Sequence, residues 1–465
     1  MSPKLRLVVA LCILSVTYGC QKTAVPAIPA NSFTDALSSV PPGKDPRTYH
    51  HFHLAGPTPP NIIFVLADDM GYEMPTFDGG SSYNTTHLDS LAANAMVFNQ
   101  CHGTPLCSPS RVELLSGLYN FRNYLKYGWG RYDASYTTYA SILEQNGYQT
   151  CVVGKWQLAN ITAGIQNMGF DNYCVRDDGG YMYRSPNIFQ DGSYIPGATT
   201  NNNKSSEDIV ANYAYNFIDQ NKDRPFFLYY SFSLIHQPDQ PTPLDANFLT
   251  FDQSVDDPIY IPSMTHYMDI KVGALINKLK ADGLEKNTII IFTGDNGSME
   301  NYYSMFKGQK VRGAKGYTVE AGTHVPMFVY WPGHITPGSN NNLVDFIDFA
   351  PTFLDMANVI NKPAMDGVSF YQQCFGRNDN ARQTLYGYFN PFPIPGQPRP
   401  QTSPITYAQD TAYKLYNQDA IKNRAGKFYH FTKDLGEYHP LLDSKLTPEQ
   451  VAEKQKLQAV LQGMP

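Results

Sequence analysis

The chain has 465 residues, enough to bury a large core, and its size alone favours two or more domains. Charged residues make up 16% of the chain and the formal net charge is −6, so no basic field indicates a nucleic-acid partner. Aromatic residues reach 13%, with 33 tyrosines, a composition that suits both sugar stacking and ordinary packing.

The first 20 residues have the pattern of an export signal. Lys4 and Arg6 form a short basic region, and Leu7–Val16 is an apolar run too short to span a bilayer. Gly19-Cys20 resembles a bacterial lipoprotein processing site, which would make Cys20 a lipid anchor; cleavage without lipidation is the other interpretation. We therefore predict export, to the periplasm or as an outer-membrane lipoprotein of a Gram-negative bacterium, or else secretion.

Residues 21–60 are rich in proline and small polar residues and have no sustained periodicity, which predicts a flexible tether. The tether contains His50, His51 and His53. No spacing among them fixes a coordination geometry, so we predict solvated side chains and no metal cluster.

Four further cysteines leave the redox state of the chain open. An even number in an exported protein permits disulfides with three possible pairings, and free buried thiols fit equally well. These residues are Cys101, Cys151, Cys174 and Cys374.

Short apolar runs alternate with amphipathic segments through residues 61–376. The predicted buried strands are Ile62–Leu66, Thr150–Val153, Phe226–Phe232, Thr288–Phe292 and Pro326–Trp331. The predicted helices are His87–Ala95, Ser141–Asn146 and Met264–Lys280. The alternation predicts an α/β catalytic domain, a large and mostly parallel sheet sandwiched by helices.

Residues 377–465 follow a different pattern. Two strand-like stretches, Ala412–Tyr416 and Gly426–Phe431, precede a terminal helix over Pro448–Gln462 with a strong start signal at Thr447. We predict a small antiparallel sheet closed by a helix.

Cys107–Gly117 reads as a loop that enters a short helix. Ser108 suits the N-cap, Pro109 suits the first helical position, and Gly117 suits the end. A cysteine ahead of a helix N-terminus, with Arg111 one turn inside, sits in a positive field that favours a reactive group and a bound anion. The alternative is an ordinary capped helix preceded by a buried cysteine.

Acidic and amide side chains follow two of the predicted strands, and the carboxyl ends of parallel strands meet at one sheet edge. The candidate metal ligands are Asp68, Asp69, Asp295 and Asn296. Their oxygen atoms suit a hard divalent cation, calcium before magnesium, whereas zinc would favour cysteine or histidine. Helix caps or turns are the alternative for any single pair.

Three cations are predicted at the same edge: Arg111, Lys155 after the Thr150–Val153 strand, and Lys315 in a glycine-flanked loop. Together with a metal, fixed cations bind a tetrahedral oxyanion whose charge grows during a reaction. His236, after the Phe226–Phe232 strand, is a candidate general acid, although a lone histidine there is more often structural.

From about Pro60 to the end, the order and spacing of these motifs resemble the sulfatase family, within the alkaline-phosphatase-like superfamily. The matching motifs are N-I-I-F-V-L-A-D-D-M-G from Asn61, C-S-P-S-R from Cys107, G-K-W-Q-L from Gly154, T-G-D-N-G from Thr293, G-A-K-G from Gly313 and V-P-M-F-V-Y-W-P-G from Val325. The resemblance is to the type I, formylglycine-dependent group.

The resemblance implies a mechanism. A maturation enzyme would convert Cys107 to Cα-formylglycine (3-oxoalanine), whose aldehyde hydrates to a geminal diol. In the first step one hydroxyl attacks the sulfur of a sulfate ester while His236 protonates the leaving alcohol. In the second step the other hydroxyl expels sulfate and restores the aldehyde. Calcium on the four metal ligands would bind the diol at position 107 and a sulfate oxygen. Arg111 would hold the diol, while Lys155, Lys315 and His236 would contact the sulfate group.

Two positions depart from the family pattern. Gln157 replaces the histidine of the usual G-K-W-H motif, and glutamine cannot act as a base near neutral pH, which predicts an altered second step. His324 stands where many relatives have arginine, so it is either a specificity contact or a packed side chain. Tyr181 and Arg184 are further specificity candidates.

The leading hypothesis is an exported sulfatase acting on a sulfated carbohydrate. The first alternative is a phosphoester or phosphonate hydrolase of the same superfamily. The second, motivated by Gln157, is a non-catalytic protein that binds sulfated glycans without turnover. The sequence does not identify the glycan or the sulfated position.

Overall fold

The computed structural model describes residues 59–123, 137–158, 161, 163–177, 179–390, 404–419 and 422–464. The predicted export signal, Cys20 and the three tether histidines lie outside these residues. Of the helices in the described ranges, none combines the length and the apolar character needed to cross a membrane.

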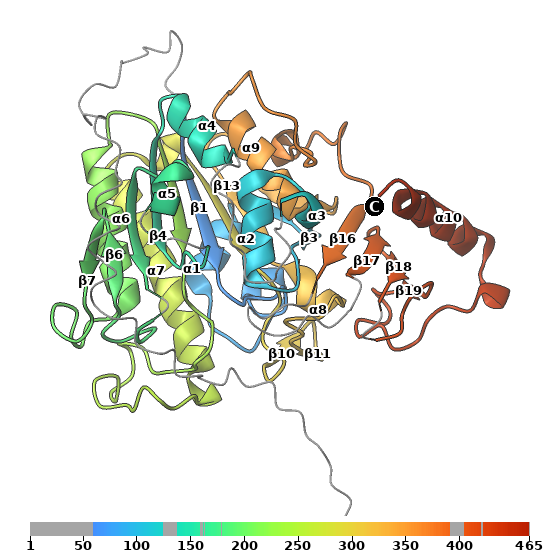
Figure 1. The fold of residues 1–465 in the computed structure, drawn as a ribbon, viewed down its shortest axis with the longest axis horizontal. Coiled ribbons are helices and arrows are strands. Elements are labelled where there is room, and N and C mark those ends of the chain that lie inside the picture. Colours follow the sequence, from blue (N-terminus) through green and yellow to red (C-terminus); the bar gives the residue numbers. More distant parts are fainter. Residues whose placement is uncertain are drawn as a thin grey trace, which may run out of the picture. The chain divides into compact units, whose positions relative to one another are not determined.

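A ten-stranded sheet forms the centre of the fold (Figure 1). Strand β1 (Asn61–Ala67) runs parallel to its two neighbours, β8 (Phe226–Ser231) and β9 (Thr288–Gly294). Beyond β8, strands β4 (Gln149–Gly154) and β5 (Asn172–Arg176) continue the parallel arrangement. Shorter strands complete the edges: β2 (Met96–Phe98), β13 (Met327–Tyr330), β14 (Gly338–Asn340), β6 (Ile188–Gln190) and β7 (Ser193–Ile195). The predicted α/β fold is confirmed.

Alternate residues of β1 feed two separate hydrophobic cores. Ile62, Phe64 and Leu66 pack on one face, while Ile63 and Val65 pack on the other. The first face is covered by α2 (Cys107–Ser116), α4 (Tyr139–Gln145) and α9 (Phe349–Met356), which lie together in Figure 1. The second is covered by α1 (Thr86–Ala92), α6 (Ser206–Gln220) and α7 (Ile261–Ala281). Each fully buried Ile, Leu or Phe stabilises the fold by about 1.5–3 kcal/mol.

The predicted elements correspond closely to β1, β4, β8, β9, β13, α1, α4 and α7. Helix α9 was not predicted because all of its residues except Asp355 are buried, so it lacks the polar face that marks an amphipathic helix. Helix α6 was not predicted either, although Val210, Ala214 and Phe217 recur at helical spacing and are buried.

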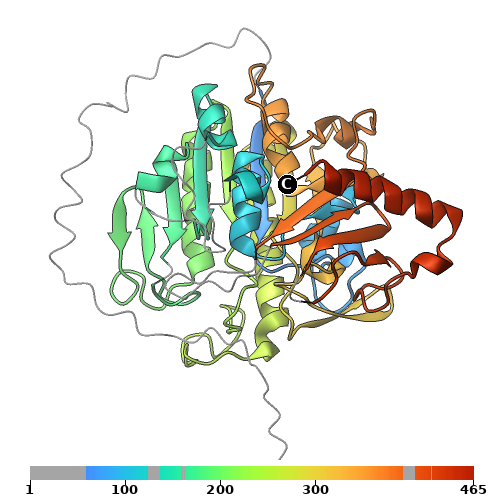
Figure 2. The ribbon, with the colours of Figure 1, turned by 45° about the vertical axis from the view of Figure 1, so that its right-hand side comes forward.

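The C-terminal part contains a four-stranded antiparallel sheet and not merely the two predicted strands (Figure 2). Its strands are β16 (Leu385–Phe389), β17 (Ile405–Gln409), β18 (Tyr413–Gln418) and β19 (Phe428–His430). Helix α10 (Pro448–Gln462) packs on this sheet through buried Leu457, and it begins at the predicted Thr447, which forms a capping box with Gln450. The small sheet with a terminal helix is therefore confirmed.

Shorter elements connect these layers. They are β3 (Cys101–His102), α3 (Asn120–Asn123), α5 (Ala163–Asn167), β10 (Tyr303–Phe306), β11 (Gln309–Arg312), α8 (Glu320–Thr323), β12 (His324–Val325) and β15 (Val344–Asp345). All five cysteines of the described residues are buried and free. Of the two interpretations left open by the sequence, the structure has free thiols and no disulfides at Cys101, Cys151, Cys174 and Cys374.

Candidate active site

The carboxylates that follow β1 and β9 lie side by side. The two strands are paired in register from Asn61 with Thr288 to Ala67 with Gly294, which brings Asp68 next to Asp295. The backbone N–H of Asp69 donates to Asp295 Oδ1 at 3.0 Å, and all three aspartates are fully buried. The pairing of two parallel strands therefore creates the acidic cluster that the sequence predicts.

Arg111 reaches this cluster from the first turns of α2. Its Nε and Nη2 atoms donate to Asp295 Oδ2 at 3.1 and 2.8 Å, and its Nη1 donates to Ser231 Oγ at 2.6 Å. Arg111 is only 1% exposed. Ser231 was not predicted as a site residue, although it ends strand β8 and so meets the same strand-end rule as Asp68 and Asp295.

Two lysines pair with the remaining carboxylates. Lys155 Nζ donates to Asp68 Oδ2 at 2.6 Å, and Lys315 Nζ donates to Asp69 Oδ2 at 2.7 Å. Gly154 has φ of +91°, and a Cβ there would lie 1.8 Å from the carbonyl oxygen of Ser231. Only glycine allows this close approach, which delivers Lys155 to the strand end.

Two lysines lower the pKa of two of the buried aspartates. Burial would raise the pKa of Asp68 and Asp69, but Lys155 beside the first and Lys315 beside the second lower both values. Burial would likewise lower the pKa of Lys315, yet Asp69 holds it above its usual value. The third aspartate differs, because burial and the neighbouring Asp68 raise the pKa of Asp295.

The donor set fits a divalent cation. Ligand atoms of Asp68, Cys107 and Asp295 lie within 4.8 Å of one another. Asp68 Oδ1 and Asn296 Oδ1 are buried and have no hydrogen-bond partner within the described residues. Asn296 Nδ2 donates to Asp69 Oδ1 at 2.8 Å, which leaves its oxygen free for a ligand. Buried, unpartnered oxygen atoms of this kind suit calcium or magnesium.

Cys107 is the first residue of α2, which corrects the predicted cap. The N-cap position is taken by Leu106 in an extended conformation, and Ser108 lies inside the helix without capping it. Pro109 is the third helical residue, where the missing N–H would have no helical partner in any case. Ser110 instead holds the preceding loop, because its hydroxyl accepts from the backbone N–H of Thr104 at 3.0 Å.

His236 lies beside Asp68 and Asp69, and ligand atoms of the three residues are within 4.8 Å of one another. Its Nδ1 is 2.5 Å from the carbonyl oxygen of Gln237, and its Nε2 is 3.8 Å from Asp69 Oδ2. Burial and the neighbouring Lys315 lower the pKa of His236. A neutral ring that donates from Nδ1 to Gln237 leaves Nε2 directed at the site.

Gln157 lies two residues after Lys155 with a left-handed backbone, φ +58°. The side chain is partly buried, and its Oε1 has no hydrogen-bond partner within the described ranges. An unpartnered amide oxygen can orient a water or a hydroxyl group, but it cannot take up a proton near neutral pH.

The three specificity candidates lie in different settings. His324 is buried, stacks between the rings of Tyr72 and His102, and has Nδ1 2.8 Å from Glu320 Oε1, which fits the packed-side-chain interpretation. Arg184 donates to the carbonyl oxygens of Phe248 and Phe251 and so holds a loop. Tyr181 is 54% exposed and is the candidate with most free surface.

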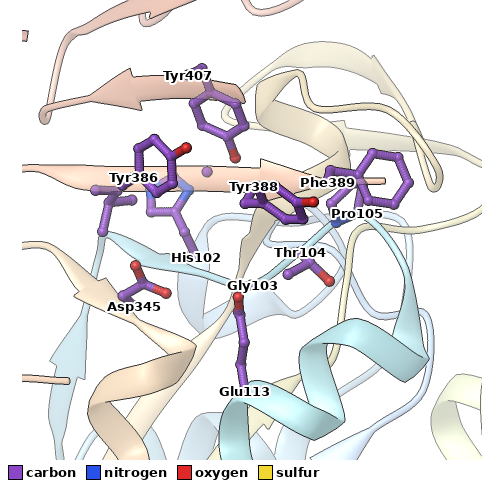
Figure 3. Close-up of a pocket in the computed structure, with 12 residues that line it drawn as sticks. His102, Gly103, Thr104, Pro105, Glu113, Asp345, Tyr386, Tyr388, Phe389 and Tyr407 are labelled. Atoms are coloured by element: carbon purple, nitrogen blue, oxygen red, sulfur yellow. The ribbon is translucent and has the colours of Figure 1, made fainter. Parts of the chain in front are cut away.

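A separate cavity lies between α2 and the C-terminal sheet (Figure 3). In Figure 3, Glu113 extends from α2 toward Gly103, and Tyr386 and Tyr388 extend from β16. Burial raises the pKa of Glu113, and that of Asp345 to about 7. None of the predicted site residues lines this cavity, so it is distinct from the charged cluster around Asp68, Asp69 and Asp295.

Two family models match the chain. The sulfatase model covers residues 60–359, and the model of the N-sulphoglucosamine sulphohydrolase C-terminal region covers residues 314–462. The chain belongs to the sulfatase family. This sulfatase thus has the alkaline-phosphatase-like fold that its sequence predicts.

Several characterised proteins are similar to this sulfatase. Human arylsulfatase A is 28% identical over 377 residues, 72% of this chain and 71% of that protein. The N-acetylgalactosamine-6-O-sulfatase of Bacteroides thetaiotaomicron is 26% identical over 412 residues, 70% of this chain and 78% of that protein. The structure of BT4656 with its substrate D-glucosamine-2-N,6-O-disulfate has a TM-score of 0.69 at 20% identity, covering 87% and 97% of the two chains, and shows a shared fold.

Proposed function

We propose that this sulfatase removes sulfate from a sulfated carbohydrate by formylglycine chemistry. The observation that carries the proposal is the meeting of Arg111, Lys155 and Lys315 with Asp68, Asp69 and Asp295 at one buried edge. Similarity to the N-acetylgalactosamine-6-O-sulfatase supports a carbohydrate as the carrier of the sulfate group.

The lysines are proposed to bind the sulfate oxygens. Lys155 and Lys315 each hold one buried aspartate, so their ammonium groups are fixed before the substrate arrives and need no reorganisation during the reaction. Calcium would be held by Asp68, Asp69, Asp295 and Asn296 with the modified residue 107, and it would supply charge stabilisation and nucleophile activation. Arg111 would orient the nucleophile from its bonds to Asp295 and Ser231.

Cys107 is the proposed precursor of the nucleophile. It is the first helical residue of α2 and lies next to Asp68 and Asp295. Conversion to formylglycine would supply a hydrated aldehyde whose hydroxyl attacks sulfur. The proposed partner for this conversion is a formylglycine-generating enzyme. Mass spectrometry of the Cys107 peptide, after co-expression with such an enzyme, should show the aldehyde or its hydrate; an unmodified thiol in every molecule would contradict the proposal.

His236 is the proposed general acid for the leaving alcohol. Its Nδ1 is held by Gln237, so Nε2 is the atom that can face the leaving oxygen. Burial and Lys315 lower the pKa of His236 in the free protein, and an anionic sulfate ester next to the ring would raise it. Gln157 would then position a hydroxyl or water in the second step without accepting its proton.

A panel of substrates tests the proposal. Sulfate release from sulfated mono- and oligosaccharides, measured by ion chromatography beside matched phosphate and phosphonate esters, should favour the sulfate esters. A preference for phosphorus esters would support the related hydrolase activity. Capture of sulfated glycans by wild-type protein without any sulfate release would support the binding protein that Gln157 motivates.

Export is also part of the proposal. The evidence for it is the basic and apolar pattern of residues 1–20 with Cys20 at the end. Metabolic labelling with a palmitate analogue in a bacterial host, with Cys20→Ser as the control, separates a lipid-anchored protein from one that is cleaved without lipidation.

A further inference from the structure

The segment that carries His236 is fixed directly to the candidate metal ligand Asp68. The backbone N–H of Asp68 donates to the carbonyl oxygen of Leu234 at 2.9 Å, and the N–H of Ile235 donates to the carbonyl oxygen of Asp68 at 2.7 Å. The N–H of His236 turns back to the carbonyl oxygen of Ser233 at 3.1 Å. The orientation of His236 is therefore set by a short backbone frame, residues 233–236.

Tyr183 closes this frame from a segment some fifty residues earlier in the chain. Its hydroxyl lies 2.9 Å from the carbonyl oxygen of Ser233 and also contacts the carbonyl oxygen of His236. The side chain is 5% exposed, and the hydroxyl bonds both ends of the frame. On the same side, the N–H of Ser233 donates to Glu207 Oε1 at 3.3 Å.

The Tyr183 hydroxyl has a geometric consequence for the imidazole. The ring of His236 has two fixed points, its own Cα and the Nδ1 contact with Gln237, and both belong to the segment that Tyr183 holds. The two carbonyl oxygens share one hydroxyl proton; without it, the oxygen of Ser233 keeps the N–H of His236 as a donor, but the oxygen of His236 loses its side-chain donor, and the frame has to shift to satisfy it. A small shift of the backbone moves Nε2 away from the leaving oxygen.

We propose that Tyr183 is a positioning residue for proton transfer by His236. The inference rests on the proposed function, because it requires His236 to protonate the leaving group. Tyr183 itself does not have to touch the substrate, so its role differs from that of the exposed Tyr181 two positions earlier.

Substrates with different leaving groups test this role. A sugar alcohol is a poor leaving group and needs a proton in the transition state, whereas a nitrophenolate leaves without one. In Tyr183→Phe we expect kcat/KM to fall about 10- to 100-fold for a sugar sulfate, but less than about threefold for 4-nitrophenyl sulfate. The first loss is smaller than the full rate enhancement by general-acid catalysis, because His236 is still present. Retained aryl sulfate turnover in the same sample also shows that the variant is folded.

Tyr230→Phe is the matched control. Tyr230 is fully buried on β8, next to the same frame, and its hydroxyl has no hydrogen-bond partner in the described part of the chain. Loss of that hydroxyl should leave both kcat/KM values and the leaving-group dependence unchanged. Equal losses on both substrates in Tyr183→Phe would mean a merely structural role and would overturn the inference.

A double-mutant cycle with His236→Ala completes the experiment. If Tyr183 acts through His236, then Tyr183→Phe should cause no further loss on the sugar sulfate when His236 is absent. Additive losses would overturn the inference. If the wild type cleaves phosphate esters in place of sulfate esters, the proposed function fails, and the same cycle run on alkyl and aryl phosphates then decides the role of Tyr183.

Discussion

Two clusters of buried charge in this sulfatase differ in how completely they are satisfied. The first is the charged strand end around Asp68, Asp69 and Asp295. The second, here the C-terminal ionic network, consists of Lys414, Asp419, Arg424 and Glu437. In the network, Glu437 Oε1 accepts from Lys414, and Glu437 Oε2 accepts from Tyr416 and Arg424. At the strand end, Asp68 Oδ1 and Asn296 Oδ1 are buried and have no hydrogen-bond partner among the residues that the structure describes.

This difference separates a structural role from a binding role. Buried polar atoms are almost always hydrogen-bonded, so unpartnered oxygen atoms gathered beside several carboxylates can accept a cation. A cluster in which each carboxylate oxygen already accepts a hydrogen bond has no oxygen free for a cation. Such a cluster connects segments of the fold. The C-terminal ionic network joins β18 to Thr318, three residues after Lys315, because Lys414 Nζ also donates to the carbonyl oxygen of Thr318.

Replacement of the proposed nucleophile precursor should have the largest effect. In Cys107→Ala no formylglycine can form, and we expect sulfate release to fall on the order of 10⁵-fold or more. Cys174 is also buried but lies outside the charged strand end, so Cys174→Ala should keep its turnover. Sulfate release by ion chromatography measures both, and substantial activity in Cys107→Ala would remove Cys107 from the mechanism.

Lys414→Met tests the structural half of the comparison. Because it leaves a buried carboxylate of Glu437 short of one cation, the free energy of unfolding should fall by about 3–5 kcal/mol. Urea unfolding measures this loss. The kcat of the folded fraction should stay within about threefold of the wild type, because Arg424 Nη2 still donates to Thr318 Oγ1 at 2.8 Å and holds the segment after Lys315. A large loss of kcat with unchanged stability would contradict the assignment.

Lys155→Met is the same substitution at the strand end. Removal of one fixed cation from an oxyanion site should lower kcat/KM by about 10²- to 10³-fold. Steady-state kinetics on a sulfated sugar, beside Lys414→Met, gives a direct test of the comparison. Kinetic effects of equal size in the two variants would show that the strand end is no more functional than the network.

Metal removal should affect the strand end alone. Calcium at about 100 times its dissociation constant should add about 2.7 kcal/mol to the free energy of unfolding. Thermal denaturation after EDTA treatment, followed by added calcium or magnesium, measures this gain. We expect Asp295→Asn to lose most of the calcium response and Lys414→Met to retain it; the same response in both would argue against a strand-end metal site.

Gln157→His should have the smallest effect. The left-handed backbone at this position is one that histidine tolerates better than most residues, so the fold should be kept. A base at this position should speed the second step and raise kcat by no more than about 10-fold, within the range of general-base catalysis. Stopped-flow measurement of any burst before steady state shows whether that step limits turnover. An unchanged kcat would mean that Gln157 is not at the limiting step.

The sequence alone determined the sheet and the charged strand end. Asp68 and Asp295 each follow a continuous apolar run, and in a parallel sheet such runs end at one edge, so their meeting follows from the pattern. Lys155 and Ser231 obey the same rule, since they follow or end strands β4 and β8.

The tertiary structure decided what no local pattern encodes. Tyr183 supports His236 across fifty-three positions in the chain, and His324 is enclosed by rings from β3 and from the segment after β1. Local periodicity shows which side of an element is buried, but not which distant backbone group a buried hydroxyl will meet. That contact depends on how separate loops pack. The sequence therefore could not distinguish His324, which packs between two rings, from Tyr183, which bonds the backbone frame of His236.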